Sequence, residues 1–184
     1  MRLVTLVGLA FLLFATAVNA QIPTKGNVYF GYSYARADLA PGGSANLNGW
    51  DASLEGKVLP LLGIVADLGG NYGGQQVSVR CPEPCAPVRE NGSAHTFLFG
   101  PRMSVSAGKF TPFAHVLIGA AHVGARGSGF SSSDTSFATA LGGGLDYKLV
   151  KGVAWRFQAD YLQTRLFSTT QDNFRFTTGL VFRF

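Results

Sequence analysis

The chain has 184 residues, with 15 basic and 10 acidic side chains and a formal net charge of +5. This mild balance, without a basic run or aromatic-interleaved Lys/Arg cluster, gives no indication of nucleic-acid binding. Only 14% of the residues are charged, while 24 are glycine and 15 are phenylalanine, an unusual composition for a soluble secreted protein. Beyond the N-terminus, no apolar stretch reaches the ~20 residues that a membrane-spanning helix needs.

The first 20 residues have the pattern of a secretory signal peptide. A charged start at Arg2 precedes an apolar run, and the small residues before Gln21 form a cleavage site. No cysteine stands at this site, which argues against a lipoprotein anchor. We therefore expect an exported chain whose residues 21–184 form one domain, with no low-complexity tail.

Eight segments then alternate between apolar residues and small or polar residues. The seventh is the clearest, because Trp155, Phe157 and Tyr161 share one face while Arg156 and Asp160 share the other. The fifth has two rather apolar rows, so its facing stays open. Each segment has roughly 9–12 residues, the length of a tilted strand that crosses a bilayer. The segments are 28–36, 50–58, 63–72, 94–105, 112–123, 137–148, 153–164 and 174–184.

The connections between these segments also alternate in length. Long ones rich in Gly, Ser, Pro or Asn are expected at 37–48, 73–93, 125–134 and 166–173, and short ones at 59–62, 106–111 and 149–152. Long external loops and short periplasmic turns are typical of outer-membrane barrels, whereas a secreted β-sandwich would mix its loop lengths. The sequence therefore predicts an all-β fold, an eight-stranded antiparallel up-and-down transmembrane β-barrel.

Aromatic residues near the predicted strand ends indicate the two membrane interfaces. Tyr32, Tyr34 and Trp50 would lie at the outer rim, and Tyr147 and Trp155 at the inner rim. Aromatic girdles occupy such positions in transmembrane barrels.

Charged residues on the predicted inner face suggest a filled lumen, because eight strands leave an interior just wide enough for side chains. If the turn between the sixth and seventh strands centres on Lys151, Asp146 lies opposite Arg156 in the lumen and Tyr147 opposite Trp155 in the lipid. The candidate lumen residues are Asp51, Glu55, Lys57, Asp67, Arg102, Asp146, Lys148, Arg156, Asp160 and Arg175.

The histidines give no catalytic pattern. Hydrolysis of an acyl chain would need a serine with a histidine and an acid, and neither His115 nor His122 has a serine two positions away. These two are seven residues apart, so they would lie on opposite faces; the third, His95, is read likewise as a rim or lumen residue. No His/Cys/Asp spacing repeats as a ligand set. We expect no enzyme, no cofactor and no metal.

Two cysteines, Cys81 and Cys85, lie in the second long connection with prolines between them. In an exported chain, a disulfide is the default interpretation. A CxxxC redox or metal site is the alternative, although no histidine or helix signal accompanies it.

Several phrases resemble the bacterial outer-membrane β-barrel domain family, the eight-stranded group related to OmpX and the OmpA membrane domain. They are FGYSY at 30–34, GIVADLGG at 63–70, FGPR at 99–102, PFAH at 112–115 and GGGLDY at 142–147. The ending at Phe182 and Phe184 resembles the aromatic signal that the barrel-assembly machinery reads. The family has no common catalytic residues to carry over, and the peptidoglycan-binding domain of full OmpA relatives is not expected here.

The resemblance implies an outer-membrane protein of a Gram-negative-type bacterium, in contact with outer-membrane lipid. We expect a monomer, although the sequence does not determine the oligomeric state. Its partners during biogenesis would be the assembly machinery and periplasmic chaperones. We favour a structural or surface-interaction role through the external loops, toward an extracellular ligand that the loops do not identify. The alternatives are a narrow porin-like channel and a lipid A-modifying enzyme. The latter is disfavoured because the last two strands lack the His-x-Ser of deacylase-type barrels.

Overall fold

The computed structural model describes residues 25–39, 43–77, 88–127, 130–166 and 169–184. Among these residues no helix is long and apolar enough to cross a membrane. The eight strands are β1 (Gly26–Leu39), β2 (Gly43–Lys57), β3 (Leu62–Val77), β4 (Val88–Ser104), β5 (Phe110–Gly127), β6 (Phe130–Val150), β7 (Val153–Leu166) and β8 (Thr169–Arg183).

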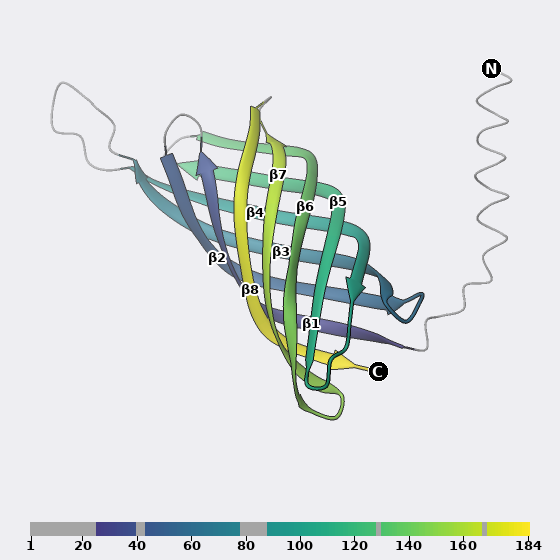
Figure 1. Cartoon of the computed structure of the whole chain (residues 1–184). Coiled ribbons are helices and arrows are strands. Elements are labelled where there is room, and N and C mark those ends of the chain that lie inside the picture. The colour runs from purple at the N-terminus through teal and green to yellow at the C-terminus, as the bar shows by residue number, and fades with distance from the viewer. Residues whose placement is uncertain (1–24, 40–42, 78–87, 128–129, 167–168) are drawn as a thin grey trace, which may run out of the picture.

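The strands form one closed barrel in chain order (Figure 1). Every neighbouring pair is antiparallel, and β8 returns to pair with β1 from Asn27↔Arg183 to Ala37↔Asn173. At this seam the backbone groups of Gly26 and Phe184 exchange two hydrogen bonds, of 3.0 and 3.1 Å. Closure leaves no free sheet edge. The predicted eight-stranded up-and-down barrel is confirmed.

The outer surface of the barrel is apolar, whereas the side chains on its inner surface are mostly buried. Phe30 and Phe157 are 60% and 48% exposed, whereas their chain neighbours Tyr29 and Arg156 are 0% and 1% exposed. The predicted alternation therefore holds, since successive side chains of a strand point to opposite sides. The exposure of the side chains also shows which face of β5 points into the barrel. Val116 and Ile118 face outward, whereas Phe113, His115 and Leu117 face inward.

The long connections were predicted too long, because the strands continue well into them. The pairing of β1 with β2 runs to Leu39↔Gly43, within the expected loop 37–48, and β6 extends over 21 residues. Beyond the apolar band both faces of a hairpin meet water, so the alternation that revealed the strands is no longer required there. The result is four long hairpins at one end of the barrel.

The three short connections at the opposite end are confirmed. The turns joining β4 to β5 and β6 to β7 use Gly108 at φ 63° and Gly152 at φ 85°, backbone conformations that favour glycine. Figure 1 shows the C-terminus of β8 at this same end.

The aromatic residues mark two levels on the outside. Tyr32 lies opposite Trp50 toward the long hairpins, and Tyr147 lies opposite Trp155 near the short turns. The Trp155 indole Nε1 donates to Thr178 Oγ1 at 2.8 Å, and Tyr34 Oη donates to Asn46 Oδ1 at 3.0 Å. Rings that are apolar in body and hydrogen-bonded at the tip suit a boundary between hydrocarbon and water.

Candidate functional site in the barrel interior

Arg175 of β8 is the centre of the charged interior. Its guanidinium lies 2.7 Å from Asp51 of β2, 3.0 Å from Asp67 of β3 and 2.8 Å from Asp160 of β7. All four side chains are at most 1% exposed. The ion pair with Asp51 lies at contact distance without the angles of a hydrogen bond, whereas Asp67 and Asp160 accept hydrogen bonds. One cation thus links three strands across the interior.

A histidine bridges this cluster to a second arginine. His115 Nε2 lies 2.8 Å from Asp160 Oδ1, while His115 Nδ1 faces Arg102 Nε and Nη2 at 3.4 and 3.3 Å. Because arginine only donates, Nδ1 must accept and the proton is assigned to Nε2, which donates to Asp160. Gln158 completes the link by donating to Asp160 Oδ2 at 2.9 Å.

Glu55 of β2 closes this network toward the short turns. Its carboxylate accepts from Arg102 Nη1 at 3.2 Å and from Asn27 Nδ2 at 2.8 Å, and it pairs with Lys57 Nζ at 2.9 Å. Lys57 also donates to Ser104 of β4. The lysine side chain is 25% exposed, so the network ends where water can enter.

A further ion pair lies between β6 and β7. Asp146 is the register partner of Arg156, and its two oxygens accept from Arg156 Nε at 2.7 Å and Nη2 at 3.0 Å. The guanidinium carbon lies 4.7 Å from the Phe113 ring and 5.0 Å from the Tyr29 ring. Arg183 donates to the same carboxylate at 3.1 Å. Two-point hydrogen bonding and aromatic contacts hold this guanidinium in one orientation.

Glycines on the inner face provide the space for these long side chains. Gly142 of β6 lies between His115 and Asp160 in the register, and a Cβ there would stand 2.0 Å from Asp160 Oδ1. At Gly69 of β3 a Cβ would stand 3.1 Å from Arg175 Nη1. The high glycine content therefore has a steric cause in part, because Gly142 and Gly69 leave room for the side chains of Asp160 and Arg175.

The interior also contains an apolar cluster that the sequence reasoning missed. Leu98 and Leu117 are fully buried, and they pack with other inward residues of β3 to β7. The prediction of an interior filled by mixed charge was thus incomplete. The sequence predicts a lumen-facing row where small or polar residues alternate with apolar ones. An inward leucine does not fit this alternation. The cluster consists of Val65, Leu98, Leu117, Ala121, Ala138, Ala140 and Leu162.

Most candidate lumen residues lie inside the barrel, but Lys148 does not. Its side chain is exposed near the turn after β6, although it shares the face of Asp146. A position on the inner face of β6 is therefore not enough for burial, because Lys148 lies closer than Asp146 to the end of the strand. Phe182 and Phe184 face outward and are 50% and 63% exposed. Residues 1–20, Cys81 and Cys85 lie outside the described residues.

The arrangement suits structural pairing better than catalysis. His115 has a carboxylate on one ring nitrogen and a guanidinium on the other, so no nitrogen is left to activate a serine. His122 lies on the outer face, as alternation predicts, with Nδ1 2.7 Å from Thr135 Oγ1, and His95 stacks edge-on against Tyr72. Within the described ranges, no group of three His, Cys, Asp or Glu side chains is placed to hold a metal ion.

A closed antiparallel barrel with an apolar outer band and a charged interior defines the class of transmembrane β-barrels. The family model described as "Outer membrane protein beta-barrel domain" matches residues 5–184, and the chain belongs to this family of outer-membrane proteins. Its location is accordingly the outer membrane of a Gram-negative bacterium. No curated protein sequence matches the chain.

Solved structures of outer-membrane proteins share the fold. Ail, the attachment invasion locus protein of Yersinia pestis, is 18% identical with a TM-score of 0.63, over 87% of this chain and 98% of Ail. Neisserial surface protein A is 13% identical with a TM-score of 0.64, over 86% of this chain and 97% of that one. A major outer membrane protein from Thermus thermophilus is 10% identical with a TM-score of 0.52, over 88% and 100%. At these identities the likeness concerns the fold.

Proposed function

We propose that this protein is a non-catalytic outer-membrane barrel that acts through its four extended hairpins, in a structural or surface-interaction role, with an occluded lumen. The observation that carries the proposal is that Arg175 forms ion pairs with three carboxylates from three different strands. Together with the apolar cluster, this contact fills the cross-section of a barrel whose interior is narrow from the outset. A filled barrel has its hairpins and its lipid-facing surface left to interact with other molecules.

The charges of the interior are balanced, which supports a plug rather than a selective pore. Five carboxylates and five basic groups form the ion pairs, and each acid contacts at least one base. Buried ions that lose their partners are costly, so the pairs resist the separation that ion flow would require. The narrow-channel alternative predicts a continuous wet path instead.

The hairpins are the proposed interaction surface because pairing carries them beyond the apolar band. The β3–β4 hairpin stays paired to Val77↔Val88, and the β5–β6 hairpin to Gly127↔Phe130. Structural neighbours include Ail, which has also been solved with the heparin analogue sucrose octasulfate. A sulfated glycan is therefore a reasonable first probe among candidate extracellular ligands.

The experiment is adhesion of cells that display the barrel to immobilised heparin and to a panel of host surface proteins. Each hairpin is shortened in turn, and Lys109→Gln at the opposite end serves as the matched surface control. The proposal expects one or more shortened hairpins to abolish adhesion while Lys109→Gln retains it. Adhesion that survives shortening of all four hairpins would count against the surface role.

A further inference from the structure

The end of the barrel that carries the short turns contains a cavity of about 870 Å³. We call it the turn-side vestibule; its lining comes from the starts of β1, β5 and β7, the ends of β2, β4, β6 and β8, and the adjoining turns. In an outer-membrane barrel the short turns face the periplasm. Its volume falls within the roughly 300–1,000 Å³ typical of sites for small ligands.

The vestibule is strongly basic. Two acidic residues line it, and both are already paired: Glu55 with Lys57 and Arg102, and Asp146 with Arg156 and Arg183. The five basic residues of the lining are Lys25, Lys57, Arg102, Arg156 and Arg183. This end of the barrel therefore has a local excess of three positive side-chain charges, although acids and bases are equal in number in the ion pairs of the whole interior.

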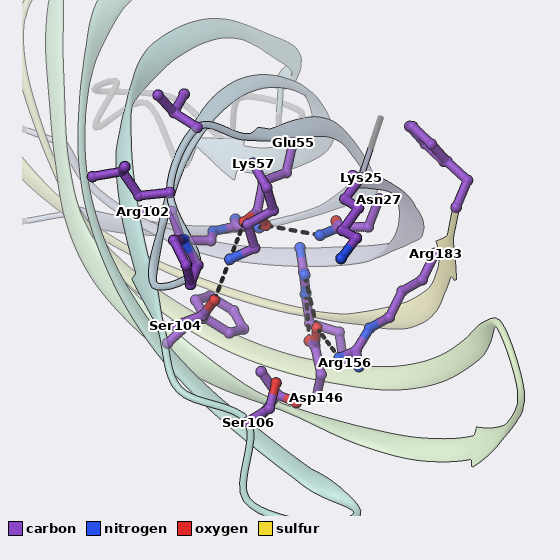
Figure 2. Close-up of a pocket in the computed structure, with 17 residues that line it drawn as sticks. Lys25, Asn27, Glu55, Lys57, Arg102, Ser104, Ser106, Asp146, Arg156 and Arg183 are labelled. Carbon is purple, nitrogen blue, oxygen red and sulfur yellow. Dashed lines mark hydrogen bonds and ion pairs between the residues drawn. The ribbon is translucent and has the colours of Figure 1, made fainter. Parts of the chain in front are cut away.

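One buried donor in the vestibule has no partner. Arg156 is 1% exposed, and its Nη1 makes no hydrogen bond with any residue that the structure describes. Its other two nitrogens are fixed on Asp146, and the rings of Phe113 and Tyr29 lie against the guanidinium. Figure 2 shows Arg156 in the middle of the group. The donor is therefore held in place without a partner. A buried unpaired N–H is costly, so a ligand oxygen that reached Nη1 would remove this cost.

We propose that the turn-side vestibule binds a phosphate-bearing anion through Arg156 Nη1, with Lys25, Lys57 and Arg183 around it. A phosphate group carries more than one negative charge and several acceptor oxygens, which suit guanidinium and ammonium donors. A single carboxylate would leave most of the excess positive charge uncompensated. The phosphate can belong to a soluble periplasmic compound or to the headgroup of an anionic phospholipid of the inner leaflet, and the chemistry of recognition is the same.

The test is calorimetric titration of pyrophosphate into the folded barrel in an uncharged maltoside detergent at low salt. Arg183→Gln and Lys25→Gln should each weaken binding at least fivefold. Lys109→Gln and Lys151→Gln are matched controls, because these exposed lysines lie at the same end but do not line the cavity, and each should change binding less than twofold. Arg156→Gln, with folding checked separately, should weaken binding most.

A competition arm identifies the source of the phosphate. Short-chain phosphatidylglycerol that displaces pyrophosphate would support the site as one for a lipid headgroup. Pyrophosphate binding that the lipid does not disturb would support a soluble ligand. The absence of binding by both compounds, or equal weakening in the lining variants and the two controls, would overturn the proposal.

Discussion

His115 Nε2 and Asp160 Oδ1 lie 2.8 Å apart although their strands, β5 and β7, are not neighbours. The contact passes over β6, where Gly142 is the register partner of both residues. A side chain at this position would occupy the space of the contact. The charged interior therefore depends on the missing side chain at Gly142 as well as on the charged residues of β5 and β7.

Gly142→Ala should break this contact. The new Cβ would stand 2.0 Å from Asp160 Oδ1 and 2.6 Å from the Ala159 carbonyl, so backbone or carboxylate must move. We expect a loss of about 1–3 kcal/mol in the free energy of unfolding, as for other overpacked sites. Urea unfolding in lipid vesicles measures it. Gly92→Ala is the control, since its Cβ would meet nothing closer than 3.7 Å; equal losses in both variants would contradict the explanation.

Arg175→Gln should be the most destabilising single change in the interior. It leaves Asp51, Asp67 and Asp160 buried without their shared cation, and removing one partner of a buried ion pair typically costs about 3–5 kcal/mol. Exposed Lys151→Gln removes the same charge and should change stability by less than about 0.5 kcal/mol. The measurement is again the urea midpoint. A variant as stable as the native barrel would show that the carboxylates do not depend on Arg175.

Asp146 and Arg156 should be energetically coupled. A double-mutant cycle with Asp146→Asn and Arg156→Gln isolates their interaction, for which contacting pairs give about 0.5–3 kcal/mol. Because Arg183 donates to the same carboxylate, the cycle is repeated in Arg183→Gln, where the coupling should rise. Additive single effects in both backgrounds would show that the observed 2.7 Å contact contributes nothing to stability.

Phe184→Asp should reduce the amount of assembled barrel in the outer membrane. Phe184 is 63% exposed on the lipid side at the β1–β8 seam, and we expect its aromatic ring to contribute to assembly. Phe184→Trp keeps an aromatic ring and should assemble normally. Heat-modifiable gel mobility of outer-membrane fractions gives the folded share. Normal assembly of Phe184→Asp would remove the basis for this role.

The strands inside the membrane could be predicted from sequence because each crosses an environment that differs on its two faces. Arg156 and Asp160 alternate with Trp155, Phe157 and Tyr161, and only one register keeps the ions out of lipid. The pairing of Asp146 with Arg156 could be predicted as well, because the short turn between β6 and β7 determines which residues lie opposite each other. The hairpin lengths could not be predicted, because above the apolar band both faces are wet.

Contacts across the barrel could not be predicted from local patterns. The pairing of Arg175 with Asp67 joins residues 108 positions apart and depends on the tilt and shear of the closed sheet. The inward leucines could not be predicted because small or polar residues alone indicate the lumen in this pattern, and the two apolar rows of the fifth strand left the facing of Leu117 open. Leu117 shows that the narrow interior also accepts an apolar side chain.

The central claim, that the lumen is occluded, is tested most directly by the conductance of the purified barrel in a planar bilayer. Insertion is verified by a fluorescent label on the same membrane, so that a silent trace reports a closed barrel and not an empty bilayer. We predict no steady conductance above the seal current, because Arg175 and its three carboxylates remain paired. A steady, large conductance from inserted barrels would contradict the occluded lumen and favour the channel.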